Sequence, residues 1–456
     1  MNKSDNRTAR EISLGILMDT LENGKLSHLA LRDALGKSGL DKTDKAFVTI
    51  LSEGTIERMI TIDYIIDLYS KVKVKKLKPV IREIMRMSVY QIMYLESVPD
   101  SAACNEAVKL VKKRGFQGLS GFVNGVLRKI CREKENVIYL EKSKDLIKYY
   151  SVKYSVPEFV IKSFIDDYGE DITVNMLHAI NEDENHITIR VNTSKISMEE
   201  LEDSLLRKNI EVEKSELVNN ALYVKNMESI GSMKEFSEGM FQIQDISSML
   251  PAKISGIKKG DICIDMCAAP GGKTMHLAEL SGGEGKIYSR DVNEYKTGLI
   301  LENIKRTGYK NVVVQIKDGT VFYEEDKEIA DIVIADVPCS GMGVFKKKTD
   351  IKYNISKDGI EELAELSRKI LGNAVRYLKP GGTLIFSTCT VNKIENDRNR
   401  KWLMDEFGLE PVDFSDLLTE KMLKTGDNEI NSKNGFLQLF ITKEYDGFYI
   451  AKFRKK

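Results

Sequence analysis

The sequence has few of the residues from which disulfide frameworks and metal sites are built. Its 456 residues include 6 cysteines and 4 histidines. The cysteines are Cys104, Cys131, Cys263, Cys267, Cys339 and Cys389. They show neither an even framework spacing nor a C-x-x-C pair, so we expect free thiols and no bound metal. Cys263 and Cys267 are expected to be small buried residues.

The chain also lacks a long hydrophobic run. Nowhere do about 18 apolar residues follow one another, which is the length that a membrane-crossing helix needs. Near the start, the apolar stretch TAREISLGILMDTL (8–21) carries Glu11 and Asp19, unlike the core of a secretory signal. We therefore expect a soluble, cytoplasmic protein that does not enter a membrane.

The sequence has no net charge, because 69 Lys and Arg balance 69 Asp and Glu. The charges are nevertheless spread unevenly, since residues 71–132 hold 14 basic and 4 acidic residues. This segment includes KVKVKKLK (71–78) and VKKRG (111–115). Such a segment is typical of an RNA-binding surface that releases counterions from phosphates. A solvated helical face is the alternative interpretation.

Three regions differ in the spacing of their apolar residues. Residues 1–140 have helical spacing, which predicts an all-α domain. Residues 141–245 mix helical stretches with short strands at 186–192 and 221–225, which predicts a small α+β domain. Residues 246–456 alternate strands and helices, as in an α/β Rossmann-like domain with a doubly wound parallel sheet. The sequence thus predicts three domains and contains no internal repeat.

The first strand-to-helix turn of the last domain is DMCAAPGGKT (265–274). Gly271 and Gly272 let the backbone come close to a ligand, and the following helix offers its first amides to an anion. A Walker A loop needs a glycine five residues before Gly272, where Cys267 stands, and G-x-G-x-x-G is absent. Neither type of nucleotide-phosphate loop is therefore predicted.

A ligand with an adenosine and a small charged tail fits this turn better. Asp291 ends the second strand, 19 residues after Gly272, where a carboxylate can accept both ribose hydroxyls. Asp318 ends the third strand and can accept from the adenine amine. Singly, each Asp is an ordinary turn or cap residue. Together with the late turn KPGG (379–382), common in methyltransferases, they predict S-adenosylmethionine as the cofactor.

Two thiols follow further strands, in DVPCSG (336–341) and FSTCT (386–390). Methyltransferases that act on amines tend to have Asp or Asn, two prolines and an aromatic residue where this chain has Asp336 to Cys339. Carbon 5 of a pyrimidine becomes nucleophilic only after a group such as a thiolate adds to carbon 6. A base must later remove the proton from carbon 5. Two cysteines can divide these tasks.

The motifs of the chain, in their order, resemble those of the RNA cytosine-C5 methyltransferases related to Sun and NOL1/NOP2. The matching motifs are FQIQDISSML (241–250), DMCAAPGGKT (265–274), DVPCSG (336–341), FSTCT (386–390) and DGFYIAKF (446–453). Residues 101–130 also resemble the NusB-like RNA-binding domain of the bacterial branch, which modifies 16S ribosomal RNA. The resemblance covers nearly the whole chain.

This resemblance implies an enzyme that uses S-adenosylmethionine to methylate carbon 5 of a cytosine in 16S ribosomal RNA through a covalent cysteine adduct. It implies that the thiol of Cys389 adds to carbon 6, and that Cys339 assists the removal of the proton and the release of the enzyme. It also implies that Asp336 and Lys273 bind the cytosine base. The implied cofactor-binding residues are Cys267, Ala268, Ala269, Pro270, Gly271, Gly272, Lys273, Asp291, Asp318 and Asp336.

The resemblance also implies a monomer that binds ribosomal RNA before or during small-subunit assembly. It implies no binding to DNA or to a membrane. The chain departs from the family after SGMGVF (340–345). There Thr349 stands where the family has the proline of a Pro-Asp pair, and Tyr353 stands where it has a Trp. This departure bears on the stiffness of the substrate loop. Two other function classes stay open: an amine methyltransferase that modifies N4, and a non-catalytic RNA-binding protein.

Overall fold

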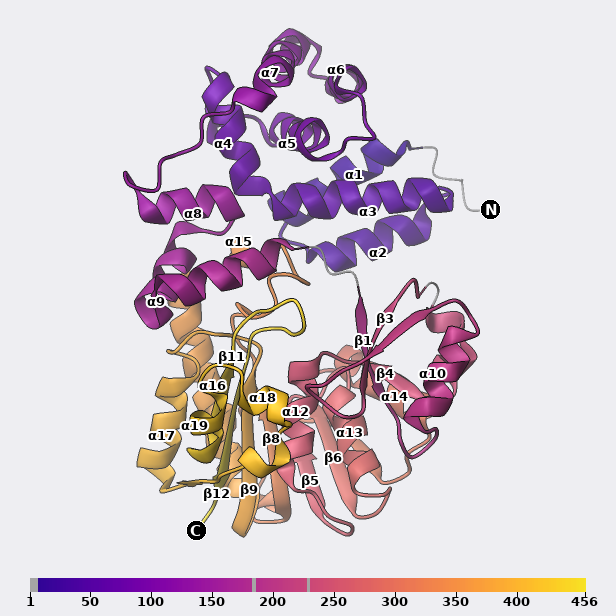
Figure 1. Ribbon diagram of the computed structural model, residues 1–456, viewed down its shortest axis with the longest axis vertical. Helices are drawn as coiled ribbons and strands as arrows, with labels where there is room; N and C mark the ends of the chain where they lie inside the picture. The colour runs from indigo at the N-terminus through magenta and orange to yellow at the C-terminus, as the bar shows by residue number, and fades with distance from the viewer. Residues whose placement is uncertain (1–6, 183–185, 228–229) are drawn as a thin grey trace. The chain divides into compact units, whose positions relative to one another are not determined.

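The computed structural model describes residues 7–182, 186–227 and 230–456, and the chain forms two compact units (Figure 1). The first unit consists of Met1–His178 and a later segment, Phe345–Asn354. The second consists of Ala179–Val344 and Ile355–Lys456. The three kinds of domain predicted from the sequence are all present, and their predicted boundaries stay predictions.

The first unit is helical throughout its described part, as the apolar spacing predicts. Its α-helices are α1 (Ala9–Leu17), α2 (Ser27–Lys37), α3 (Lys42–Glu57), α4 (Met59–Tyr69), α5 (Pro79–Tyr94), α6 (Asp100–Lys113), α7 (Ser120–Glu133), α8 (Leu146–Tyr154), α9 (Glu158–Asn181) and α15 (Ile351–Asn354). Thr8 and Glu11 form a capping box at the start of α1, and Pro79 begins α5, where its missing N–H is not needed. Helices α1 and α3 to α7 share one apolar core.

The basic run 71–78 does not lie on an α-helical face. It forms the connection between α4 and α5, with only a short 3-10 turn, η2 (Val74–Lys76). Val74 is buried beneath this connection, whereas the five lysines of the run are exposed. The alternative of a solvated helical face therefore does not apply to this run, and its ammonium groups are accessible to phosphates.

The segment Phe345–Asn354 completes the helical unit although it follows the Pro-Cys motif in sequence. Asp350 is buried, and its two carboxylate oxygens accept hydrogen bonds from the backbone N–H of Ser27 at 3.1 Å and its hydroxyl at 2.8 Å. These bonds join residues that are 323 positions apart. The segment is thus fixed to the start of α2 by a buried carboxylate.

Two further side chains of the segment are enclosed by the helical unit. Lys352 is fully buried and donates to the backbone oxygen of Glu57 at 2.8 Å, and burial lowers the pKa of Lys352 to about 7. The hydroxyl of Tyr353 donates to the same oxygen at 3.1 Å and lies 3.1 Å from the hydroxyl of Ser155. At the position of Tyr353, where the sequence departs from the family, the chain is therefore held by packing and hydrogen bonds.

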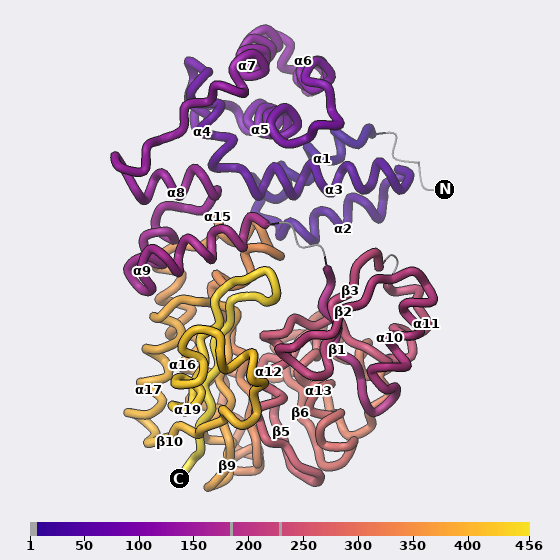
Figure 2. Tube along the Cα trace, in the orientation of Figure 1, coloured from indigo at the N-terminus to yellow at the C-terminus, as the bar shows by residue number. Residues whose placement is uncertain are grey.

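The second unit begins with a small four-stranded antiparallel sheet, in the order β2-β3-β1-β4. Its strands are β1 (Ile187–Val191), β2 (Glu211–Lys214), β3 (Ala221–Lys225) and β4 (Phe241–Ile243). Figure 2 shows helices α10 (Met198–Leu206) and α11 (Lys234–Ser237) beside this sheet. Both helices contribute apolar side chains to its core. This arrangement confirms the predicted small α+β domain.

The larger sheet follows the order β10-β12-β9-β8-β5-β6-β7, with β11 paired to β12. Its strands are β5 (Ile262–Asp265), β6 (Lys286–Asp291), β7 (Val312–Ile316), β8 (Ala330–Asp336), β9 (Leu378–Thr388), β10 (Glu410–Pro411), β11 (Phe436–Leu439) and β12 (Phe448–Arg454). Strands β5 to β9 are parallel, as predicted. The sheet as a whole is mixed, because β12 runs antiparallel to β9, β10 and β11.

Helices cover both faces of the larger sheet, since successive strand residues point to opposite sides. Ile332 and Ile334 of β8 face a core that includes α12 (Ile246–Ser255) and α13 (Gly272–Leu280). Val333 of the same strand faces a core formed with α16 (Lys357–Tyr377) and α17 (Asp397–Phe407). This double cover confirms the Rossmann-like architecture and leaves the carboxyl ends of the parallel strands at one edge.

A buried ion pair joins the small sheet to α13 within the second unit. The guanidinium of Arg190, on β1, pairs with the carboxylate of Glu279 and donates through Nε to Gln244 at 2.9 Å. Glu279 also accepts from the backbone N–H of Thr193 at 2.8 Å and from its hydroxyl at 2.6 Å. The start of the small sheet is thereby fastened to the helix that follows the glycine turn.

Within residues 7–182, 186–227 and 230–456, no helix has the length and apolar character to cross a membrane. In the same ranges, no three His, Cys, Asp or Glu side chains gather as a metal site requires. The absence of a bound metal stays a prediction.

Candidate active site

The turn between β5 and α13, together with the first two residues of α13, contains all seven residues predicted to run along the cofactor. They are Cys267, Ala268, Ala269, Pro270, Gly271, Gly272 and Lys273. Gly271 has a φ of 104°, a left-handed conformation that favours glycine, and it is the N-terminal cap of α13. No side chain caps this helix, so its first amides point toward the turn without a side-chain acceptor. The turn can therefore donate to a carboxylate.

Aspartates stand at the ends of four neighbouring strands. Asp265 ends β5, Asp291 ends β6, Asp318 follows β7 by two residues, and Asp336 ends β8. Because the order β8-β5-β6-β7 is parallel, the four carboxylates lie along one edge of the sheet. Asp291 and Asp336 are ordered by hydrogen bonds within the site. The strand order thus assembles a row of acceptors beside the glycine turn.

Asp291 also shapes the turn itself. One of its carboxylate oxygens accepts from the backbone N–H of Ala269 at 3.0 Å, and the other lies 3.1 Å from the ammonium of Lys296. Asp265 is fully buried, and burial raises its pKa to about 6. Its Oδ1 atom has no hydrogen-bond partner within the part of the chain that the structure describes.

The chemistry of this edge fits S-adenosylmethionine. Carboxylates accept from ribose hydroxyls and from amines, and the turn amides donate to the carboxylate of a methionine. Val292 directly follows Asp291, and Ile316 is its neighbour on β7; they are 50% and 55% exposed. Such exposed apolar side chains can cover the faces of an adenine ring. The described residues therefore supply both the polar and the apolar contacts that the cofactor requires.

The two predicted catalytic thiols lie side by side. Cys339 follows β8 by three residues and Cys389 follows β9 directly, and these strands are parallel neighbours. Their Sγ atoms are 3.3 Å apart without a disulfide bond, and both cysteines are half-buried. The hydrogen bond to Cys389, together with burial, raises the pKa of Cys339 well above its usual value. Cys339 is therefore a protonated thiol at neutral pH.

Lys273 and Asp336, the predicted cytosine-binding pair, are in direct contact. The ammonium of Lys273 lies 2.6 Å from Asp336 Oδ2, and Ser387 donates to Asp336 Oδ1 at 2.9 Å. Burial opposes the charge of Lys273, but Asp336 and, more weakly, Cys389 raise the pKa of its ammonium. Lys273 therefore stays cationic beside Cys389, and a nearby cation favours the thiolate form of a cysteine.

The closing motif 446–453 also reaches this site. Gly343 N–H donates to the backbone oxygen of Cys389 at 3.0 Å, and Gly447 N–H donates to the oxygen of Gly343 at 2.9 Å. A Cβ atom on Gly343 would collide with the carbonyl of Gly447, so this approach requires glycine. The Phe448 ring lies 5.5 Å from the Lys273 ammonium. Three motifs that are distant in sequence thus meet around the thiols.

Comparison with known proteins matches three family models to successive parts of the chain. Residues 7–132 match the NusB family, 156–230 match a ferredoxin-like domain of RsmF/B-like methyltransferases, and 254–454 match the 16S rRNA methyltransferase RsmB/F family. The probable ribosomal RNA small subunit methyltransferase B of Bacillus subtilis is 35% identical over 98% of this chain and 99% of its own length. The chain belongs to the RsmB/F family.

Other relatives agree with this assignment. The Synechocystis protein with the same description is 30% identical, over 98% of this chain and 99% of its own length. The crystal structure of PH0851 superposes with a TM-score of 0.80 and 27% identity, and it covers 100% of both chains. As an RsmB/F protein, the chain is an S-adenosylmethionine-dependent methyltransferase, which confirms the predicted cofactor and the NusB-like, small α+β and Rossmann-like parts.

Glu395, which no sequence pattern marks as a site residue, joins the two cysteine motifs. Its side chain is 1% exposed, and its carboxylate accepts from the N–H of Ser340 at 2.7 Å and from the hydroxyl of Ser340 at 2.5 Å. The hydroxyls of Ser340 and Thr390, which follow Cys339 and Cys389, are 2.9 Å apart. Glu395 thereby fixes the spacing of the two thiols. It lies in the charged stretch NKIENDRNR, where nothing distinguishes it from an exposed residue.

The burial of Glu395 predicts a dependence of stability on pH. Burial raises the pKa of Glu395 from 4.5 to about 7, so the folded protein holds a proton that the unfolded chain releases. The protonated carboxyl contributes about 3 kcal/mol to the free energy of unfolding below pH 4.5. This contribution is lost as the pH rises through 7. Between these limits, the free energy of unfolding should fall less steeply with pH in Glu395→Gln than in the wild type.

Urea denaturation of both proteins at several pH values between about 4.5 and 8 measures this difference. Asp265 and Glu83 also have raised pKa values, of about 6 and about 7, but they titrate in both proteins and their effects cancel. If the two stability curves ran parallel across this interval, the buried carboxyl of Glu395 would not be the titrating group.

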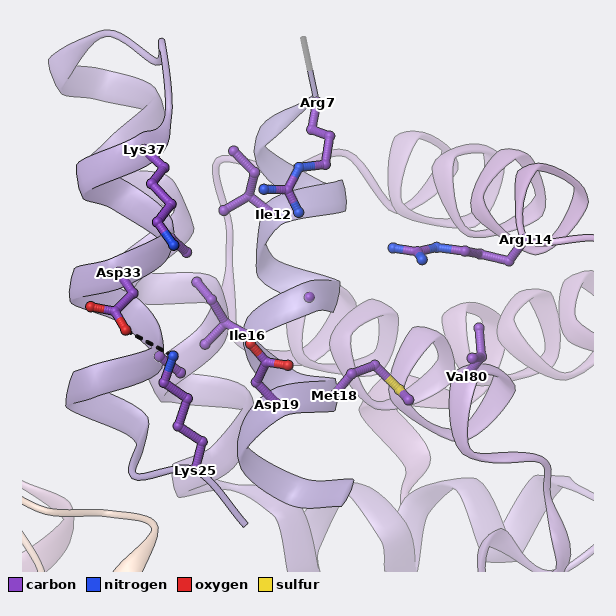
Figure 3. A pocket seen from close by; sticks show the side chains of 13 residues that line it. Arg7, Ile12, Ile16, Met18, Asp19, Lys25, Asp33, Lys37, Val80 and Arg114 are labelled. Atoms are coloured by element: carbon purple, nitrogen blue, oxygen red, sulfur yellow. Dashed lines mark hydrogen bonds and ion pairs between the residues drawn. The ribbon is translucent and has the colours of Figure 1, made fainter. Parts of the chain in front are cut away.

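The helical unit carries a separate basic hollow of about 390 Å³. Figure 3 shows Arg7 just before α1, Lys37 at the end of α2 and Arg114 just after α6 around it, with Lys25 paired to Asp33 at 2.9 Å. Arg114 belongs to the basic segment 71–132. The hollow therefore offers cationic side chains from three parts of the helical unit to a polyanion.

Proposed function

We propose that this protein methylates carbon 5 of a cytosine in 16S ribosomal RNA through a covalent adduct at carbon 6. The observation that carries the proposal is the 3.3 Å contact between the thiols of Cys339 and Cys389 beside the cationic Lys273. Transfer to an amine needs no thiol, because the nitrogen is itself a nucleophile. A paired thiol and thiolate suit a reaction that needs both a nucleophile and a base.

In this proposal the reaction starts at Cys389. Its thiolate adds to carbon 6, the S–C6 bond forms, and the π electrons of the C5–C6 bond move to carbon 5. Asp336 binds the N3/N4 edge of the ring and Lys273 stabilises the charge that develops there. S-adenosylmethionine, held by the turn 267–273 and Asp291, would supply an electrophilic methyl group to carbon 5 and would leave as a neutral thioether.

Cys339 completes the cycle after methyl transfer. Its thiol first releases its proton to solvent, and the thiolate then removes the proton from carbon 5. The C–H electrons restore the C5–C6 double bond, and the S–C6 bond breaks to release Cys389 as a thiolate. The raised pKa of Cys339 suits this order, because a thiol of high pKa leaves the first attack to its neighbour and gives a stronger base once it has lost its proton. The two cysteines thus differ in the step that each controls.

Ribosomal RNA is the proposed substrate because the relatives are described as small-subunit rRNA methyltransferases and the helical unit matches the NusB family. The exposed lysines of 71–78 and the hollow around Arg114 provide the charge for phosphate contacts. In this proposal the protein acts as a cytoplasmic monomer before or during small-subunit assembly, while the target cytosine is still accessible.

Nucleoside mass spectrometry tests the function directly. Small-subunit RNA from cells without this gene is treated with the full-length protein and S-adenosylmethionine, and its nucleosides are then separated. The proposal expects 5-methylcytidine. The appearance of N4-methylcytidine would favour the amine methyltransferase, and no new methylated nucleoside would favour a non-catalytic RNA-binding protein.

The proposed cofactor contact makes a second, independent prediction. Asp291→Ala should weaken S-adenosylmethionine binding by roughly 10- to 150-fold, because hydrogen bonds to a charged acceptor contribute about 1.5 to 3 kcal/mol. Calorimetry measures this affinity. Asp331→Ala is the matched control, since Asp331 also accepts from a backbone N–H and pairs with a lysine, but at the opposite end of β8. Equal affinities for the two folded variants would contradict the role of Asp291.

A further inference from the structure

A second hollow in the helical unit, of about 380 Å³, is lined by aromatic rings and cations. Tyr94 comes from the end of α5, Tyr139 from the connection after α7, and Tyr149 from α8. Arg58 and Lys153 line the same hollow. Its size is in the range of small-ligand sites, and its lining differs from that of the basic hollow around Arg114.

Two of the rings are supported by other tyrosines, and each remains partly open to solvent. Tyr94 stacks on Tyr90 with a centroid distance of 5.4 Å, and Tyr139 stacks on Tyr64 at 6.2 Å. Tyr94 is 37% exposed and Tyr139 is 44% exposed. A ring that is supported from within and exposed toward a hollow provides a platform for another flat ring.

The charges around the hollow narrow the class of ligand. The guanidinium of Arg58 lies 5.7 Å from the Tyr94 ring centre and pairs with Glu57 at 3.1 Å. The ammonium of Lys153 lies 5.6 Å from the Tyr149 ring centre. Aromatic cages also bind quaternary ammonium ions, but two resident cations disfavour a third. A ligand with an aromatic ring and a negative charge fits both features.

We propose that this hollow binds one unpaired nucleotide of the RNA, with its base on the tyrosine platform and its phosphate near Lys153 and Arg58. The inference rests on the proposed function, in which RNA is the substrate, and adds that the helical unit holds a single-stranded part of it. A base within a duplex is covered on both faces by its neighbours, whereas an unpaired base can stack on aromatic side chains. The site thus selects unpaired RNA.

Fluorescence anisotropy with the full-length protein tests this site, using a single-stranded RNA of about 12 nucleotides, since single-strand sites span about 4 to 16. Tyr94→Leu should weaken binding by roughly 5- to 150-fold, the loss expected for one stacked base. Tyr94→Phe keeps the ring and should bind as the wild type does. The duplex formed from the same strand should bind all three proteins equally.

A pair of lysine variants tests the phosphate contact. Lys153→Met should reduce the slope of log affinity against log salt by about 0.7, as for one phosphate contact on a single strand. Lys162→Met is the matched control, because Lys162 lies on α9 in the same unit and pairs with Asp166 at 2.9 Å. The slope of this control should equal that of the wild type.

Three results would overturn the inference. The first is the same affinity for the single strand in Tyr94→Leu and Tyr94→Phe. The second is a loss of duplex affinity in Tyr94→Leu as large as its loss of single-strand affinity. The third is the same salt slope for the two lysine variants. A failure of the proposed function is a different result, because the wild type would then bind RNA without forming 5-methylcytidine. Circular dichroism and S-adenosylmethionine affinity of Tyr94→Leu show whether the variant is folded.

Discussion

Cys339→Ala should accumulate a covalent complex with RNA, whereas Cys389→Ala should form none and lose methylation by a factor of roughly 10⁴ or more. The 3.3 Å contact places both thiols within reach of one pyrimidine ring. Without Cys389, carbon 5 is not activated. Without Cys339, attack and methyl transfer proceed but carbon 5 keeps its proton, so the S–C6 bond cannot break. A denaturing gel separates free from RNA-linked protein.

The double variant Cys339→Ala/Cys389→Ala is the control, and it should show no slow band with RNA and cofactor present. A covalent complex in Cys389→Ala rather than Cys339→Ala would exchange the two roles. If neither single variant trapped RNA and both still methylated it, the two-cysteine mechanism would be wrong and methylation of an amine would be favoured.

The second large effect concerns the buried ion pair between Arg190 and Glu279. Arg190→Met should lower the free energy of unfolding by about 3 to 5 kcal/mol, because it leaves the carboxylate of Glu279 buried without its counter-ion. Gln244 also loses the hydrogen bond from Arg190 Nε. Urea denaturation followed by circular dichroism measures the loss.

The double variant Arg190→Met/Glu279→Leu separates the ion pair from general packing. It removes both charges, so it should recover most of the lost stability, as apolar replacements of buried ion pairs do. If the double variant were as unstable as the sum of its single variants, the two charges would not interact energetically. The bonds from Thr193 to Glu279 account for the part that is not recovered.

Local patterns in the sequence predict those parts of the site that depend on one strand and the turn after it. The turn 265–274 and the thiols of Cys339 and Cys389 all follow strands with clear apolar character, so their place at one sheet edge follows from parallel topology. The resemblance to a known family adds the roles of these residues. The 3.3 Å separation of the thiols required the strand order, since β8 and β9 are neighbours in the sheet.

Contacts over long sequence distances were not predictable in the same way. Glu395 is polar and lies among charged residues, yet it is buried because Ser340, 55 positions away, donates to it twice. Asp350 likewise bonds to Ser27 across 323 positions. A polar residue is buried only where distant donors surround it, and apolar periodicity carries no information about such donors.

The return of Phe345–Asn354 to the helical unit has a consequence for synthesis on the ribosome. Ser27 and Glu57 gain their partners Asp350 and Lys352 only after the chain has been made well past His178, where the rest of this unit ends. At roughly 5 to 20 residues per second, a bacterial-type ribosome needs about 9 to 35 s for that stretch. A nascent chain stalled before Phe345 therefore carries a helical bundle that still lacks its last buried contacts.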